Sequence, residues 1–354
     1  MKIAITGYHG TGSSAILDLL SEYEGTTEGG LHSYEHVPLY FPNGLFDLEY
    51  KLLHGNDPHR SDEAIKSFRK AMYELNDLNF GWFGSYGDLY GNEFKQNVDA
   101  FIDSLVQFSC EAEWYGYYIP PHFSAAKFIK DCVKTLIPGK KINGKFGIVP
   151  MQLTRQTKEI SFVSEETFYQ NSKRFIENYF RMINKEEKPV LLLDHLMVPH
   201  NANRIDRFFD DDFRLIIVER DARDLFVLCK YVWTRMGMEP PYPTDPDAFL
   251  KFWTNMRKAE QIQDHPHVLR VWFEDLVYRY DETVAKIEAF TGLTPQQHIA
   301  PKTRFDPARS INNTQNFLID RSWAAEVASY DQHPEYLYSF PYERIADIND
   351  TFDS

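Results

Sequence analysis

The chain begins with the stretch that predicts its fold, KIAITGYHGTGSSAILDLL (residues 2–20). Lys2–Thr6 is a short apolar run typical of a buried strand, and a glycine-rich turn follows it. Ala15–Leu20 then places apolar residues at helical spacing. A strand, a glycine turn and a helix in this order form the first half of a βαβ unit. This opening predicts an α/β protein.

Three later apolar runs predict further buried parallel strands: Val190–Leu193, Leu215–Val218 and Val268–Trp272. The carboxyl ends of the strands in an open parallel sheet line its ligand crevice. We therefore expect functional residues directly after these runs. The polar and charged residues in those places are Asp194, His195, Glu219, Arg220, Asp221, Glu274 and Asp275.

A long middle region, about residues 35–188, separates the first strand and helix from the later strands. Asp62–Leu75 and Glu165–Ile183 have helical periodicity. We found no internal repeat and no low-complexity linker. We interpret residues 1–354 as a single α/β domain in which about 35–188 form a mainly helical insertion. The predicted architecture is a P-loop-type three-layer sandwich with a central parallel sheet.

The composition narrows the class of protein. The 354 residues would make two domains at about 150 residues each, or one large α/β domain. The formal net charge of −14 argues against a non-specific binder of nucleic acid or anionic membranes, yet allows a local pocket for a small anion. We find no signal-peptide core and no stretch of bilayer-spanning length, so we expect a cytoplasmic protein.

The three cysteines are Cys110, Cys132 and Cys229. They form no CxxC or other metal-spaced pair, which argues against a disulfide framework and against a cysteine-based zinc site.

The glycine-rich turn has the spacing of a P-loop, from Gly7 to Gly12-Ser13-Ser14. Its backbone N–H groups and the following helix N-terminus would together bind phosphate oxygens. The position that holds the lysine of a nucleoside-triphosphate kinase is Ser13 here. The loop therefore suits phosphate without indicating ATP hydrolysis. The alternative is an ordinary strand-to-helix turn.

A second anion site is predicted after Leu215–Val218, where Arg220 and Arg223 stand three residues apart. Arginine suits bidentate phosphate recognition. The alternative is a structural Arg–Asp ladder, because Asp221 and Asp224 would pair with the same arginines.

At this point the sequence resembles the PAPS-dependent sulfotransferases, as a divergent, bacterial-type member. Four ordered segments carry the resemblance. They are Gly10–Ser14, similar to the 5′-phosphosulfate loop; Val218–Asp224, similar to the 3′-phosphate motif; Val268–Val277 with Ile287–Leu293, similar to the late strand, Glu-Asp-Leu and Phe-x-Gly-Leu pattern; and Phe305–Ser310 with Asn312-Asn313, similar to the C-terminal loop that closes over the cofactor.

The resemblance implies a sulfotransferase that moves a sulfuryl group from PAPS to a hydroxyl (or amine) of a carbohydrate, lipid or small-molecule acceptor, with no metal. It implies that Gly10, Thr11, Gly12, Ser13 and Ser14 hold the 5′-phosphosulfate and that Arg220 holds the 3′-phosphate. Arg223, Cys229, Arg309 and Asn312 are the further cofactor-binding candidates that it implies.

Two positions depart from the family pattern. Gly10 stands where the family has Lys or Arg, and His9, one residue earlier, is the candidate to replace part of that charge. Leu228, eight residues after Arg220, stands where the family has a serine.

The transfer needs a base for the acceptor hydroxyl. His195 is the first candidate, because Asp194-His195-Leu196 resembles the Thr-His-Leu segment of the cytosolic branch, and the usual histidine pKa near 6.5 suits the task. The alternative is a histidine that caps the strand. Further candidates are Asp194, His9, Glu28, His32, Glu35 and His36.

Two other functions stay open on the sequence. In a P-loop kinase that uses ATP and Mg²⁺, Asp194 would be a Walker-B aspartate and Ser13 or Ser14 the other ligand. A non-catalytic nucleotide-binding relative is the second alternative.

The aromatic stretches Asn79–Tyr86 and Trp114–Phe123 suit a flat apolar or sugar-ring acceptor, or plain core packing. The acidic charge disfavours a polyanionic acceptor, and we expect no nucleic-acid partner.

Overall fold

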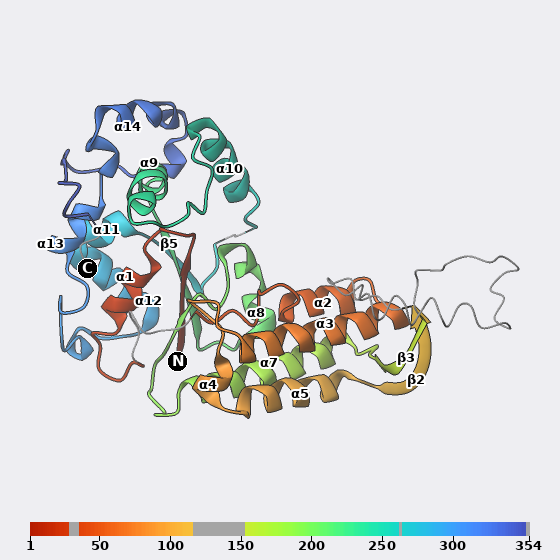
Figure 1. Ribbon diagram of the computed structural model, residues 1–354. Coiled ribbons are helices and arrows are strands. Elements are labelled where there is room, and N and C mark those ends of the chain that lie inside the picture. The colour runs from red at the N-terminus through yellow and green to blue at the C-terminus, as the bar shows by residue number, and fades with distance from the viewer. Residues whose placement is uncertain (28–34, 116–152, 262–263, 352–354) are drawn as a thin grey trace, which may run out of the picture.

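The fold is taken from a computed structural model that describes residues 1–27, 35–115, 153–261 and 264–351 (Figure 1). A four-stranded parallel sheet in the order β4-β1-β5-β6 forms its centre. The strands are β1 (Lys2–Gly7), β4 (Leu191–Asp194), β5 (Phe213–Glu219) and β6 (Val268–Trp272). All four predicted strands are confirmed, and they run in parallel as expected.

The register brings the carboxyl ends of the strands to one edge. Ile5 of β1 pairs with Asp194, the last residue of β4, and Gly7 pairs with Val218 of β5. Glu219 at the end of β5 pairs with Trp272 at the end of β6. The polar residues that follow each strand therefore meet along this edge, which we call the carboxyl edge.

Alternating side chains of the strands build two cores. Ile3 and Ile5 pack on one face of the sheet with apolar residues of α1, α11 and α12, whereas Ala4 packs on the other face with the helices of the middle region. Burial on both faces explains the almost continuous apolar runs of the strands. The predicted three-layer α/β sandwich is confirmed.

The first face of the sheet is covered by one helix that comes directly after the glycine-rich loop and by two helices that come after β6. They are α1 (Ser13–Leu20), α11 (Phe273–Tyr278) and α12 (Tyr280–Thr291).

The middle region forms an elongated helical arm that extends away from the sheet (Figure 1). Its core is continuous with the second sheet face, since Phe68 and Phe175 belong to one buried cluster with Leu193 of β4. The two helices expected from periodicity are confirmed as α3 and α7. The helices of this region are α2 (Leu45–Leu53), α3 (Pro58–Asp77), α4 (Tyr86–Tyr90), α5 (Glu93–Leu105) and α7 (Glu165–Ile183).

An antiparallel pair of strands, β2 (Phe108–Tyr115) and β3 (Leu153–Ile160), lies at the far end of the arm (Figure 1). The sequence analysis did not predict these strands. Leu153–Ile160 is mainly polar, so it lacks the apolar run that marks the strands of the central sheet.

A further group of helices packs beside the carboxyl edge, around a third buried cluster that includes Phe226, Phe249 and Trp253. It consists of α9 (Ala222–Val227), a π-helical turn (Leu228–Trp233), α10 (Pro246–Lys258) and α14 (Arg321–Glu326). The short helix α13 (Pro307–Ser310) instead contacts α11. The short helix α8 (Ile205–Phe208) lies where the arm meets the sheet (Figure 1). Among the helices of the described ranges, none has the length and apolarity needed to cross a bilayer.

Candidate functional site

The loop between β1 and α1 forms the centre of the carboxyl edge. Gly10 and Gly12 have φ values of 81° and 94°, in the left-handed region that favours glycine. Gly12 is the N-cap of α1, and no side chain caps this helix end. The first N–H groups of the helix, from Ser13 and Ser14, have no acceptor inside the helix. This arrangement of backbone amides can bind an anion, as the sequence predicts.

Thr11 shapes this loop from within. Its side chain is fully buried, and its hydroxyl accepts the Tyr8 N–H at 3.0 Å while donating to the Tyr8 carbonyl at 2.9 Å. The Thr11 amide also donates to that carbonyl at 3.0 Å. The geometry therefore favours a structural role for the Thr11 side chain. Ser13 is partly buried and Ser14 is exposed at the start of the helix.

Arg220 follows β5 and connects the loop to the C-terminal part of the chain. Its side chain is 3% exposed, and its guanidinium donates to the Gly10 carbonyl at 2.7 Å and to the Asn313 carbonyl. The guanidinium also lies 5.0 Å from the centre of the Phe273 ring. The structure thus brings three of the predicted segments together around one arginine.

Arg223 has a different environment from Arg220. It forms two hydrogen bonds to the Asp221 carboxylate, at 3.0 and 2.7 Å, and contacts Asp331 at 3.4 Å. Its guanidinium lies 4.4 Å from the centre of the Phe317 ring. This geometry favours the Arg–Asp ladder for Arg223.

Two fully buried carboxyl groups lie next to Arg220: Glu274, which is among the polar residues expected after the strands, and Asp224, which was not expected as a site residue. Burial raises the pKa of Glu274 well above its usual range, with the nearby Asp221 charge adding to the effect and Arg220 opposing it. Burial likewise raises the pKa of Asp224 to about 7. Glu274 accepts the Asp221 N–H at 2.9 Å, and Asp224 accepts the Gln315 N–H at 2.6 Å. The Glu-Asp-Leu motif marks Glu274 in the sequence, but the raised pKa of its carboxyl depends on tertiary burial.

The helix after Arg220 changes from α9 to the π-helical turn at Leu228. Leu228 is 1% exposed and Cys229 is 2% exposed. Burial raises the pKa of the Cys229 thiol to about 12, although the positive charge of Arg220 opposes this shift. Cys229 is thus a neutral thiol at physiological pH, suited to packing more than to binding an anion.

The predicted closing segment lies across the carboxyl edge through Asn313, which accepts from Arg220. Arg344, which the sequence analysis did not single out, donates to the Ile311 carbonyl at 3.1 Å and to the Asn312 side chain.

Arg309 of the same segment is exposed and donates to the Arg304 carbonyl at 3.1 Å. Burial raises the pKa of Asp18 in α1 to about 6, and the positive charges of Arg304 and Arg309 oppose this shift. Arg304 and Arg309 therefore lie close enough to α1 to influence the protonation of Asp18.

A cluster of acid and base groups lies at the end of β4. His195 Nδ1 is 2.8 Å from Asp194 Oδ1 and 4.0 Å from Glu35 Oε1. The backbone of His195 has a φ of 49°, which is uncommon for a residue with a β-carbon. The His195 amide still donates to the Ile5 carbonyl of β1 at 2.9 Å. The left-handed turn thus occurs directly at the end of the parallel ladder.

Charges around His195 set its protonation. Burial alone would lower the pKa of His195, but the hydrogen bond and charge of Asp194, together with the charge of Glu35, raise it overall. Burial raises the pKa of Glu35, and the negative charge of Asp194 adds to this shift. A carboxylate that bonds Nδ1 fixes the proton there and leaves Nε2 as the basic nitrogen.

The other predicted acid and base candidates are placed differently. Partial burial and the nearby His195 lower the pKa of His9, so His9 adds little positive charge at neutral pH. His36 is buried, and its Nδ1 is 2.9 Å from the Tyr179 hydroxyl, which indicates a core histidine. Glu28 and His32 lie outside the described residues.

An aromatic turn, which we define as residues 79–84, lies beside the acid and base cluster. The Glu35 N–H donates to the Trp82 carbonyl at 3.0 Å. Phe80 and Phe83 stack with ring centres 5.1 Å apart, and Trp82 is 71% exposed. The turn therefore exposes an apolar ring surface next to the end of β4. The other aromatic stretch, Trp114–Phe123, lies outside the described residues from position 116 onward.

The sulfotransferase domain family matches residues 1–328, so the chain belongs to this family. Among solved structures, the chain is similar to the sulfotransferase domain of the Synechococcus olefin synthase, with 13% identity over 97% of this chain and 89% of that one and a TM-score of 0.38. No curated protein sequence matches the chain.

Two further structures are similar at comparable identity. The sulfotransferase domain from the curacin biosynthetic pathway has 12% identity over 97% of this chain and 92% of that one, with a TM-score of 0.36. A sulfotransferase of Mycobacterium tuberculosis has 12% identity over 89% of this chain and 76% of that one, with a TM-score of 0.30.

The family match identifies the reaction class. The chain is a PAPS-dependent sulfotransferase, and the kinase and the non-catalytic alternatives are set aside. The carboxyl edge offers donors that fit PAPS: loop amides at the α1 N-terminus and the buried guanidinium of Arg220. The side chain of Leu228 offers no hydrogen-bonding atom at the position where the resemblance predicts a serine.

Proposed function

We propose that this sulfotransferase transfers the sulfuryl group to a hydroxyl group of an acceptor that has a flat apolar or sugar ring, with His195 as the general base. Carbohydrates carry such a hydroxyl, and so do those lipids and small molecules that contain a sugar, phenolic or other flat ring. The observation that carries the proposal is the pair of backbone contacts of the His195–Asp194–Glu35 cluster. The His195 amide donates to Ile5 of β1, the strand that leads into the phosphate loop, and the Glu35 amide donates to Trp82 of the aromatic turn.

The proposed donor site uses the loop and Arg220. PAPS, when bound, supplies the sulfuryl group and leaves as the 3′,5′-bisphosphate. The amides of residues 10–14 would hold the 5′-phosphosulfate, and Arg220 would hold the 3′-phosphate. Arg220 already contacts the Gly10 and Asn313 carbonyls, so a 3′-phosphate bound by Arg220 would couple the loop to the closing segment.

In the proposed mechanism, His195 Nε2 accepts the proton of the acceptor hydroxyl as that oxygen attacks sulfur. A new S–O bond forms to the acceptor while the S–O bond to the 5′-phosphate breaks. Asp194 holds the Nδ1 proton and stabilises the imidazolium that results. The loop amides and Arg220 stabilise the charge that develops on the leaving bisphosphate.

The aromatic turn is the proposed acceptor surface, and the helices of residues 35–188 would form the acceptor side of one domain. The Trp82 carbonyl accepts from the Glu35 amide, and the Glu35 carboxylate lies 4.0 Å from His195, so a ring bound on this turn would lie near His195. Aromatic side chains bind apolar and sugar rings through their faces, and Trp also offers an N–H for a hydroxyl.

The test separates chemistry from binding. Sulfuryl transfer from PAPS is measured over a panel of phenolic, sugar and lipid alcohols, together with calorimetry of the bisphosphate. His195→Ala should lower turnover by about 10²- to 10⁴-fold while bisphosphate affinity stays close to wild type. Trp82→Ala should raise the acceptor KM with little change in protein stability, since this side chain is 71% exposed.

Unchanged turnover in His195→Ala would remove this residue from the base role. Unchanged KM in Trp82→Ala would remove the aromatic turn from the acceptor site. His59→Ala, at an exposed position of α3, serves as the control.

A further inference from the structure

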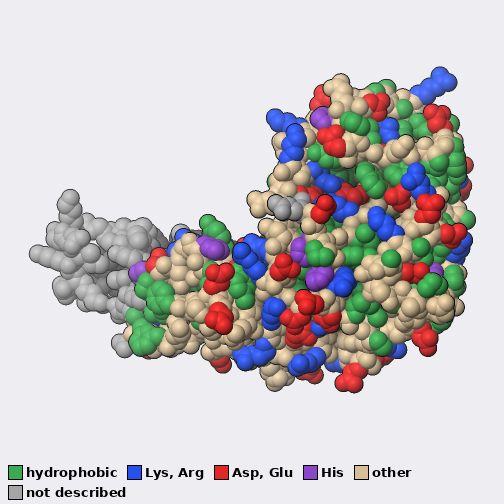
Figure 2. All heavy atoms as spheres, turned by 180° about the vertical axis from the view of Figure 1, so that it is seen from behind, with side chains coloured by type: hydrophobic (Ala, Val, Ile, Leu, Met, Phe, Trp, Pro, Cys, Tyr) green, Lys and Arg blue, Asp and Glu red, His purple; other side chains and the backbone are tan. Residues whose placement is uncertain are grey.

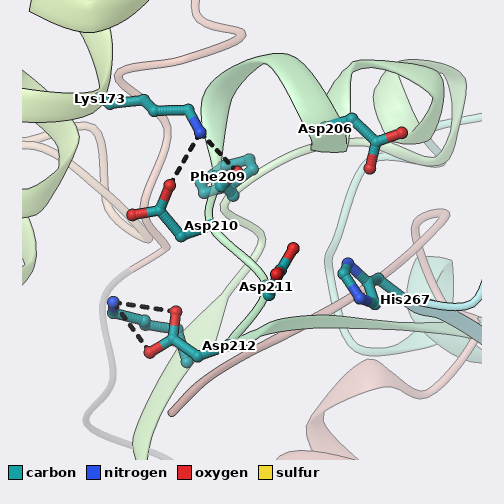
Figure 3. A pocket seen from close by; sticks show the side chains of 8 residues that line it. Lys173, Asp206, Phe209, Asp210, Asp211, Asp212 and His267 are labelled. Carbon is teal, nitrogen blue, oxygen red and sulfur yellow. Dashed lines mark hydrogen bonds and ion pairs between the residues drawn. The ribbon is translucent and has the colours of Figure 1, made fainter.

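A second cluster of ligand-type side chains lies at the amino edge of the sheet, opposite the carboxyl edge. Asp206 belongs to α8, which precedes β5, while His265 and His267 stand just before β6. On the face shown in Figure 2, histidine and acidic side chains gather where the arm meets the body of the molecule. Asp206 and His267 also line a pocket with Asp210, Asp211 and Asp212 (Figure 3). None of these residues belongs to the proposed transfer site.

The geometry of the three side chains suits a single bound ion. One ligand atom from each of Asp206, His265 and His267 lies within 4.8 Å of the other two. His265 Nε2 is 3.1 Å from Asp206 Oδ1, and the two imidazole rings have centres 5.5 Å apart. In Figure 3 the Asp206 carboxylate lies close to the His267 ring. Small side-chain rotations would therefore bring all three atoms to one centre.

The donor set indicates the kind of ion. Two imidazoles with one carboxylate suit zinc and other divalent transition metals, whereas Mg²⁺ and Ca²⁺ prefer oxygen ligands alone. Three protein ligands would leave a position for water. The Asp206 side chain is 75% exposed, so an ion would reach the site from solvent.

We propose that Asp206, His265 and His267 form a binding site for one divalent transition-metal ion, such as Zn²⁺. Neither the sulfotransferase reaction nor the proposed function requires this site. The ion would join α8 to the segment before β6 and so stabilise the amino edge of the sheet.

The hydrogen bonds of His265 show what binding would change. His265 Nδ1 is 3.1 Å from the backbone N–H of His267 and accepts from it, so the neutral ring carries its proton on Nε2, facing Asp206. Binding of the ion to Nε2 would move this proton to Nδ1 and open the bond to the His267 amide. The loaded site would therefore differ in one backbone contact directly before β6.

The test uses the untagged full chain after treatment with a chelator. Zn²⁺ binding is measured by calorimetry at pH 7.5, and Co²⁺ binding by the visible absorption that Co²⁺ shows in a tetrahedral site. We expect one ion per chain and a higher melting temperature when the ion is bound. His267→Ala and Asp206→Asn should each weaken binding by about tenfold or more.

The control is His333→Ala, because His333 Nδ1 also lies near a carboxylate, 3.5 Å from Glu335, outside the cluster. This variant should bind the ion as wild type does. Melting curves without metal show whether each ligand variant is folded. Absence of binding in the wild type, or equal affinity in the folded ligand variants, would overturn the proposal. Sulfuryl transfer should be the same with and without chelator, so the outcome is independent of the proposed function.

Discussion

Leu228 lies directly against the backbone of Gly10: a β-carbon built at Gly10 would be 3.3 Å from Leu228 Cδ2. The same β-carbon would be 2.9 Å from Leu225 Cδ1 and 3.2 Å from the Trp233 ring. The sequence shows Gly10 and Leu228 as two separate departures from the sulfotransferase pattern. The structure shows that they are neighbours. Leu228, which stands where the family has a serine, occupies together with Leu225 and Trp233 the space that a side chain at position 10 would need.

We first predict the effect of a side chain at this contact. Gly10→Ala should destabilise the protein by about 1–3 kcal/mol, because it adds backbone strain at positive φ and overlaps with Leu225. Gly237 provides a matched control, since its φ is 79° and a β-carbon added there would have no atom within 4 Å. Urea denaturation of both variants separates the cost of backbone strain at positive φ from the cost of overlap with neighbouring side chains. An equal loss in Gly10→Ala and Gly237→Ala would show that Leu225 and Leu228 adjust without cost.

The two arginines after β5 should have different effects on donor binding. Arg220→Met should weaken binding of the 3′,5′-bisphosphate by roughly tenfold or more, because it removes charge-assisted hydrogen bonds to phosphate. Arg223→Met removes the Asp221 pair instead and should mainly lower stability. The measurement is the ratio of the affinities for the bisphosphate and for adenosine 5′-monophosphate. A general structural defect would lower both affinities and leave this ratio unchanged. A ratio that falls equally in both variants would contradict the separate roles.

The pH dependence of transfer should identify the base. His195 must be unprotonated to accept a proton, and its pKa is raised by Asp194 and Glu35. Hence kcat/KM should rise with pH through an apparent pKa above the usual 6.5 of histidine. Glu35→Gln removes one negative charge near His195, so the rise should move to lower pH while activity persists. Loss of all activity in Glu35→Gln would instead identify Glu35 as the base.

Acid should destabilise the protein partly through His36. Burial lowers the pKa of His36 to about 4, whereas the unfolded chain has the usual value near 6.5. Between these values the unfolded state binds more protons, so stability falls as pH falls through this window. The loss reaches about 1.4 kcal/mol per pH unit. His36→Gln should show a shallower loss between pH 6.5 and 4 in urea denaturation. Parallel curves for the two proteins would show that other groups control acid unfolding.

The sequence predicts the central sheet well because each strand is buried on both faces. Val190–Leu193 and Leu215–Val218 are apolar runs that can be recognised as strands from their local composition alone, and both lie in the sheet. By contrast, β2 and β3 pair with each other across a long stretch of chain, and β3 is mainly polar. Such strands form because they pair with a segment far away in the chain, and this pairing is not visible in the local sequence pattern.

The site divides in the same way. The loop glycines, Arg220 and His195 could be selected from the sequence because they follow strands that share one edge. The spacing of Arg220 and Arg223 beside aspartates does not distinguish the two arginines, although the family resemblance implies Arg220 for the 3′-phosphate. The fold places Asp221 against Arg223 and places carbonyls of Gly10 and Asn313 against Arg220.

The sequence by itself determined which segments form the strands of the central sheet and where the motifs stand along the chain, because apolar periodicity and glycine turns depend on a few neighbouring residues. The tertiary structure alone decided which side chains touch and which carry charge. Glu35 lies near His195, Leu228 lies near Gly10, and the pKa of the Glu274 carboxyl is raised well above its usual range only when folding buries it. The reason is physical: burial and long-range contact set desolvation and hydrogen bonding, and these depend on residues far apart in the chain.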